Sequence, residues 1–147
     1  MYIPTAKGYF SGCGGLEIGI MQAGIEVIQS LDLDSEATNC LKNNPQYFSH
    51  SILNVDIKEK TVLDQPETDI ILGTYPCTKY STIADIHGTR IGDDLLRPFS
   101  IREYARLQGF PDDYYFENKR SSYRLIGNAV PVHMGKWVGT QAMKYFN

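Results

Sequence analysis

The sequence predicts an α/β fold in which helices flank an open, largely parallel sheet. Apolar, β-branched segments alternate with helix-like segments along the first 75 residues, the order expected of strands joined by helical crossovers. Residues 68–73 are apolar along most of their length, as in a parallel strand buried on both faces. A glycine-rich turn at residues 10–15 separates the first strand from the first helix, an order typical of nucleotide-type sites.

The expected elements follow this alternation along the chain. Strands are expected at residues 2–9, 26–32, 51–53 and 68–73. Helices are expected at residues 16–23 and 36–43, the second capped by Ser35 and burying Ala37, Cys40 and Leu41. The glycines allow a sharp turn and a close ligand approach, although such a turn often does no more than join a strand to a helix.

The last third of the chain contains a second set of helix signals. Ser100 and Glu103 have the spacing of a capping box, which predicts a short helix to Leu107 closed by Gly109. Residues 123–131 are interpreted as an extended stretch that ends in a turn. Pro131 suits the first turn of a final helix, in which Trp137 is expected to pack in the core. The apolar face of that helix would carry Met134, Val138, Ala142 and Tyr145.

Composition limits the class of protein. With 147 residues, 42% of them hydrophobic, the chain can form one domain with a core. It has neither an apolar run that would span a membrane nor a signal-peptide core, so a cytoplasmic location is expected. Cys13, Cys40 and Cys77 are far apart and odd in number, which argues against a zinc site and a disulfide framework. A net charge of −3 gives no global attraction to nucleic acid, so any DNA contact would be local.

Polar residues follow the ends of the expected strands. Asp32 ends the second strand about 20 residues after the glycines, where an acid can accept hydrogen bonds from ribose hydroxyls. Asp56 follows the third strand and Cys77 the fourth. Ligands of open parallel sheets bind at the carboxyl ends of strands, which favours one shared site. Each residue also has an ordinary interpretation, since acids cap helices or face solvent and cysteine often packs as a small hydrophobe.

Taken together, six segments resemble the motifs of the cytosine-C5 DNA methyltransferase family, in the family's order and over nearly all of the chain. Residues 10–15 (Phe-Ser-Gly-Cys-Gly-Gly) resemble its S-adenosylmethionine loop, F-x-G-x-G-G, and residues 74–77 (Thr-Tyr-Pro-Cys) its catalytic Pro-Cys loop. The other four are residues 32–34 (acidic second motif), 55–57 (third motif, which contacts adenine), 97–111 (ninth motif) and 124–131 (tenth motif, which closes over the cofactor).

The resemblance implies a Rossmann-like, S-adenosylmethionine-dependent methyltransferase sheet that methylates C5 of cytosine in double-stranded DNA, in a bacterial or phage setting. It implies Cys77 as the nucleophile. A thiolate that adds at C6 makes C5 reactive toward a methyl sulfonium, and the base must first leave the duplex stack. It implies no metal. The implied cofactor-binding residues are Phe10, Ser11, Gly12, Gly14, Gly15, Asp32, Leu33, Asp56, Ile57, Pro76, Asn128 and Ala129.

The sequence also departs from the family pattern. It lacks the Glu-Asn-Val motif that binds the flipped cytosine, the Arg-x-Arg motif and the target-recognition domain. Glu117-Asn118 is not a substitute, because Lys119 follows it and it lies between the ninth and tenth motifs. We therefore expect one catalytic domain that is truncated or lacks its central part, with front motifs in residues 1–96 and tail motifs in residues 97–147.

Three interpretations follow for activity. The chain is a methyltransferase that a second, complementing chain or a missing middle completes, or it is an inactive remnant that binds S-adenosylmethionine. The third, an unrelated dinucleotide-binding domain, is disfavoured because the glycine spacing is not G-x-G-x-x-G.

Overall fold

The fold contains one parallel sheet. The structure is a computed structural model, and it describes residues 2–59, 66–75 and 99–146. The strands are β1 (Thr5–Tyr9), β2 (Glu26–Asp32), β3 (Ser51–Asn54) and β4 (Ile70–Gly73), and they pair in the order β3-β2-β1-β4. All three pairings are parallel, which confirms the predicted α/β class.

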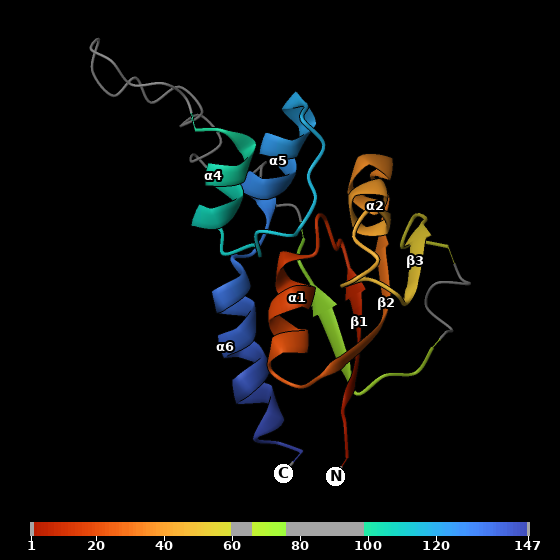
Figure 1. The fold of residues 1–147 in the computed structure, drawn as a ribbon. Helices are drawn as coiled ribbons and strands as arrows, with labels where there is room; N and C mark the ends of the chain where they lie inside the picture. Colours follow the sequence, from red (N-terminus) through yellow and green to blue (C-terminus); the bar gives the residue numbers. More distant parts are fainter. Residues whose placement is uncertain (1, 60–65, 76–98, 147) are drawn as a thin grey trace.

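Five helices accompany the sheet in the described part of the chain. They are α1 (Gly15–Gln22), α2 (Ser35–Lys42), α4 (Ile101–Leu107), α5 (Arg120–Asn128) and α6 (Val132–Met143). Figure 1 shows α1 and α6 side by side, with α4 and α5 together near the end of the sheet to which the strand arrows point. A Cβ atom on Gly19 of α1 would overlap the backbone of α6 at Lys136, so the two helices touch backbone to backbone.

An aromatic core holds residues 99–146, called the tail segment below, against the first half of the chain. Tyr114 is fully buried, and its ring centroid lies 5.0 Å from that of Phe110 and 4.9 Å from that of Phe116. Phe48, from the segment after α2, meets Tyr114 edge to face at 6.3 Å. Such aromatic pairs bury large areas and fix ring orientation, so this cluster sets where the tail segment lies.

The local signals around α4 are confirmed. Ser100 accepts a hydrogen bond from the backbone N–H of Glu103, and the Glu103 carboxylate accepts one from the backbone N–H of Ser100. Gly109 has a φ of 78°, the left-handed conformation that ends many helices. For α2 the predicted cap is wrong by one residue: Asp34, not Ser35, accepts the hydrogen bond from Glu36 N–H at 2.9 Å.

The extended stretch predicted for residues 123–131 is wrong, because α5 covers residues 120–128. Ser122, Leu125 and Ile126 are its buried residues, at the spacing of a helix face. Only the short link between Asn128 and Val132 is extended. The turn signals at Gly127 and Asn128 mark the end of a helix rather than the end of a strand.

The predicted packing of the final helix is wrong except at Ala142, which is partly buried against a core cluster. Trp137 is 61% exposed, and Met134, Val138 and Tyr145 are exposed as well. The buried residues of α6 are Val132, Gly135 and Gly139, because contact with α1 at backbone distance leaves no room for large side chains. Likewise, β4 is not buried on both faces: Leu72 is buried, but Ile71 is 61% exposed on this edge strand of the described sheet.

Candidate functional site

The glycine turn, residues 10–15, leaves the carboxyl end of β1 in an unusual backbone conformation. Phe10, Gly12 and Gly14 all have positive φ angles, of 59°, 56° and 75°. A Cβ atom on Gly14 would overlap the Phe48 ring, whereas one on Gly12 would have no atom within 4 Å. The turn is therefore packed on one side and open at Gly12, where a ligand can approach the backbone.

Asp32, at the end of β2, is tied to this turn. One carboxylate oxygen accepts a hydrogen bond from Gly12 N–H at 2.9 Å, and the other accepts one from Asp34 N–H at 2.9 Å. A carboxylate oxygen can accept more than one hydrogen bond, so acceptor capacity remains for a ligand. The next residue, Leu33, is 67% exposed and presents apolar surface beside the carboxylate.

The end of β3 reaches the same edge of the sheet. Ile57 packs with Phe10 in a small apolar cluster around Tyr9 and Leu31. Asp56 is partly buried and accepts a hydrogen bond from Lys58 N–H at 3.0 Å, which forms a local turn. The candidate residues from β1, β2 and β3 thus gather at the carboxyl ends of three adjacent strands.

The tail segment contributes two further candidate residues. A Cβ atom on Gly15 would overlap the Val130 carbonyl oxygen and lie 3.3 Å from the Cβ of Ala129. Asn128 is exposed at the end of α5. The link between α5 and α6 therefore lies against the start of α1. Pro76, Cys77 and the Leu96–Arg97 junction lie outside the described residues.

Two residues that the sequence analysis missed hold the tail segment to the site. The Tyr114 hydroxyl donates a hydrogen bond to the Cys13 carbonyl at 2.8 Å, across 101 positions of sequence. Arg124 donates a hydrogen bond to the Asp34 carboxylate at 2.7 Å, two residues beyond Asp32. The density of aromatics in residues 110–116 was a signal for a buried cluster, but no sequence pattern identifies the carbonyl that Tyr114 reaches.

Burial keeps the cysteines of this region protonated. Cys13 donates a hydrogen bond to the Leu125 carbonyl at 3.3 Å, and burial raises its thiol pKa well above its ordinary value. Burial also raises the pKa of Cys40, to about 11. Both thiols are therefore poor nucleophiles and serve in packing.

A third missed residue, Glu17, lies beneath the glycine turn. Glu17 is only 2% exposed. It is the one charged residue in the otherwise uncharged stretch 16–21, and this was the available sequence signal for its burial. The carboxylate occupies the space that a side chain on Gly8 would fill, close to the Ser11 hydroxyl. Burial raises the pKa of Glu17 to about 7, while the Ser11 hydroxyl and the backbone N–H of Glu17 act in the opposite direction.

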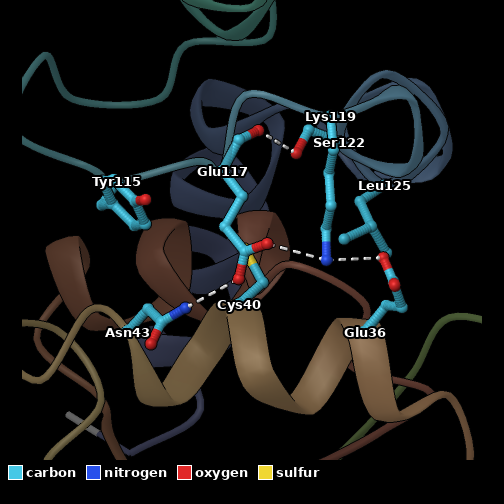
Figure 2. Close-up of a pocket in the computed structure, with 8 residues that line it drawn as sticks. All are labelled: Glu36, Cys40, Asn43, Tyr115, Glu117, Lys119, Ser122 and Leu125. Carbon is cyan, nitrogen blue, oxygen red and sulfur yellow. Dashed lines mark hydrogen bonds and ion pairs between the residues drawn. The ribbon is translucent and has the colours of Figure 1, made fainter.

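Glu117, set aside in the sequence, belongs to a separate junction between α2 and α5. Figure 2 shows Lys119 between two carboxylates, 2.8 Å from Glu117 and 3.1 Å from Glu36. The Asn43 amide also reaches Glu117, at 3.5 Å. Hydrogen bonds to Glu117 and then Glu36 raise the pKa of Lys119. The Glu117 carboxylate is thus occupied by contacts that join helices.

Two other features concern the described residues only. None of their helices has the length and apolar character needed to cross a bilayer. They contain no group of three or more His, Cys, Asp or Glu side chains arranged to hold a metal ion.

Comparison with known proteins finds a match between this chain and the model of a protein family. The model of the C-5 cytosine-specific DNA methylase family matches residues 8–90 and residues 82–144. These two matches cover the glycine turn, the strand ends and the tail segment up to residue 144.

Individual relatives match over shorter stretches. The chain is 46% identical to the type II methyltransferase M.Sau96I of Staphylococcus aureus over 74 residues, which is 49% of this chain and 17% of the relative. It is 54% identical to M.Eco47II of Escherichia coli over 44 residues, 29% of this chain and 11% of that protein. It is 38% identical to M.HindV of Haemophilus influenzae over 77 residues, 50% of this chain and 24% of that protein. The chain thus spans less than a quarter of the length of these relatives.

Proposed function

Because this chain belongs to the C-5 cytosine-specific DNA methylase family, we propose that its glycine turn binds S-adenosylmethionine for methyl transfer to C5 of cytosine in DNA. The observation that carries the proposal is the convergence of the turn, Asp32, Ile57 and Ala129 at one edge of the parallel sheet. This is the edge at which open α/β sheets bind their ligands.

Features of the turn support the fit of this cofactor. Gly12 presents open backbone, because a Cβ atom at that position would have no other atom within 4 Å. An exposed Leu33 beside Asp32 suits an adenine ring above a ribose. The residues that would hold the cofactor are Phe10, Ser11, Gly12, Gly14, Gly15, Asp32, Leu33, Asp56, Ile57, Pro76, Asn128 and Ala129.

We assign the roles in the chemistry as follows. When bound, the cofactor supplies an electrophilic methyl group on sulfur. Cys77 adds as a thiolate to C6 of a cytosine that has left the duplex, which makes C5 nucleophilic. After methylation, loss of the C5 proton and departure of the thiolate restore the base. Residues 1–96 and 97–147 would form two parts of the same catalytic domain.

The family's Glu-Asn-Val motif is not found in this sequence. The acid that holds the cytosine and the domain that reads double-stranded DNA would therefore come from a second chain or from a central part that this sequence lacks. The absence of these motifs from residues 1–147 also favours a second candidate function. In that case the chain binds S-adenosylmethionine without catalysis.

Calorimetric titration with S-adenosylmethionine tests the binding step. We expect Asp32→Asn to weaken binding severalfold, because the carboxylate both accepts cofactor hydrogen bonds and holds Gly12 N–H. Asp69→Asn is the matched control, because Asp69 accepts hydrogen bonds from Tyr2 and Thr5 at the amino-terminal end of β1, whereas the turn follows the carboxyl end of that strand. Absence of cofactor binding by the wild-type chain would refute the proposal.

DNA containing 5-fluorocytosine separates the two candidate functions. An active enzyme forms a covalent complex that Cys77→Ala abolishes. A chain that binds cofactor but forms no complex is the non-catalytic form. Adding the middle region of a relative as a separate polypeptide then tests whether a second chain restores the reaction.

A further inference from the structure

Beneath the glycine turn lies a buried carboxyl group that the proposed chemistry does not use. Glu17 sits in the first turn of α1 with its carboxylate over Gly8, and 2% of the residue is exposed. Ser11, whose hydroxyl lies near the same spot, directly precedes the open residue Gly12. The carboxylate is therefore one layer below the surface that would receive the cofactor.

Within residues 2–59, 66–75 and 99–146, no cation pairs with this carboxylate. The groups whose charges couple to it are all acids, thiols or phenols: Asp32, Cys13 and Tyr114. Lys7, on the adjacent strand β1, instead places its Nζ over the Tyr9 ring, 5.5 Å from the centroid. From α6, the residues packed near α1 are Val132 and Gly135, while His133 and Lys136 are exposed.

Asp32 has no ion pair either in this part of the chain. Its oxygens accept from two backbone N–H groups. The nearby cation, Arg124, is engaged with Asp34 at 2.7 Å. The turn is thus flanked by two carboxylates with no compensating positive side chain, an arrangement complementary to a cationic ligand.

We propose that the buried carboxylate of Glu17 makes the glycine turn discriminate between S-adenosylmethionine and its demethylated product by charge. The inference rests on the proposed function. The methyl donor carries a sulfonium and therefore one more positive charge than S-adenosylhomocysteine. Glu17 is a positioning and specificity residue that acts through the field at the turn, and it takes no part in a bond-making step.

Proton linkage follows from this arrangement. With a pKa of about 7, Glu17 is only partly ionised near neutral pH in the free protein. A cation bound nearby favours the ionised carboxylate, so binding of the methyl donor expels a proton. Affinity for the donor therefore rises with pH through about 7, by up to tenfold between pH 6 and 8. The neutral product lacks this dependence.

The test compares wild-type protein with Glu17→Gln, which keeps the shape of the side chain and removes its charge. Binding of S-adenosylmethionine and of S-adenosylhomocysteine is measured by titration calorimetry from pH 6 to 8, in two buffers that differ in ionisation enthalpy. The cofactor's own amino group titrates in this range, but it does so equally with both proteins and cancels in the comparison.

We expect wild type to release more protons than Glu17→Gln on binding the methyl donor. We also expect the preference for the donor over the product to be present in wild type and lost in Glu17→Gln. Glu17→Asp, which keeps the charge, should retain part of the pH dependence. Parallel pH profiles for wild type and Glu17→Gln with the methyl donor overturn this inference alone. If neither ligand binds wild type at any pH, the proposed function fails as well.

Discussion

Two of the contacts between the tail segment and the rest of the chain have opposite character. Beneath the glycine turn the contact is aromatic and buried, and its hydrogen bond runs from Tyr114 to a backbone carbonyl. Between α2 and α5 it is ionic and partly exposed, with Lys119 shared by two carboxylates. Buried apolar area stabilises far more than solvent-screened ion pairs do. We infer that the aromatic contact determines whether the tail segment docks and that the ionic contact refines its orientation.

Removing the centre of the aromatic contact should have the largest effect. Tyr114→Ala deletes a fully buried ring that packs on Phe110, Phe116 and Phe48. Substitutions of this kind cost about 3–5 kcal/mol, a large share of the stability of a small domain. Urea unfolding followed by circular dichroism measures the loss. Tyr145→Ala is the control, because Tyr145 is 88% exposed; equal effects at the two positions would contradict the comparison.

A buried charge beside the same contact should make stability depend on pH. Because burial raises the pKa of Glu17 from 4.5 to about 7, the folded protein retains a proton that the unfolded chain releases. Stability therefore falls as pH rises from about 4.5 to 7 and stays low above, by about 3 kcal/mol in total. Glu17→Gln should unfold at higher urea than wild type at pH 8 and at similar urea at pH 5.

The control for this pH effect is Glu26→Gln, a substitution of an exposed glutamate on β2. It should leave the difference in stability between pH 5 and pH 8 as it is in wild type. A Glu17→Gln variant with the full wild-type pH dependence would show that another group is responsible.

A subtler change isolates the hydrogen bond within the aromatic contact. Tyr114→Phe keeps the ring and leaves the Cys13 carbonyl without its donor. An unsatisfied buried acceptor costs about 1–2 kcal/mol, so the loss should be well below that of Tyr114→Ala. Amide hydrogen exchange should show the change concentrated in residues 10–15. Uniform loss of protection over the whole chain would instead show that the bond supports global stability alone.

The smallest effect is expected at the ionic contact. Lys119→Met removes the cation between Glu36 and Glu117 but keeps the aliphatic stem. Its midpoint of urea unfolding should lie close to that of wild type at 0.15 M salt and below it at low salt. A loss comparable to that of Tyr114→Phe would reverse the assigned ranking of the two contacts.

The parts of the fold with local signals were predictable from sequence. Runs of apolar and β-branched residues located the four strands, and the Ser100 capping box located α4. At α5 the prediction failed because Gly127 and Asn128 are turn residues that also suit a helix end. At α6 it failed because large apolar residues were assigned to the buried face, whereas glycines occupy it where two backbones touch.

For the candidate site, the alternation of strands and helices predicted that Asp32 and the glycine turn would share a site, since the carboxyl ends of parallel strands share an edge. The partners of that site could not be predicted in the same way. Tyr114 reaches Cys13 over 101 residues, and Arg124 reaches Asp34 over 90. Such pairings depend on how the tail segment docks in three dimensions, and no local pattern carries that information.

The contact between α1 and α6 has a consequence for how the chain folds. It joins the first helix of the sequence to the last described one, so its loop closure spans more than a hundred residues. Contacts so distant in sequence form late, because the chain must lose the entropy of closing a long loop before any packing energy is gained. During synthesis, the side of α1 that later holds α6 stays uncovered until residues 132–143 have left the ribosome. Until then, this side of α1 is open to aggregation and to chaperone capture.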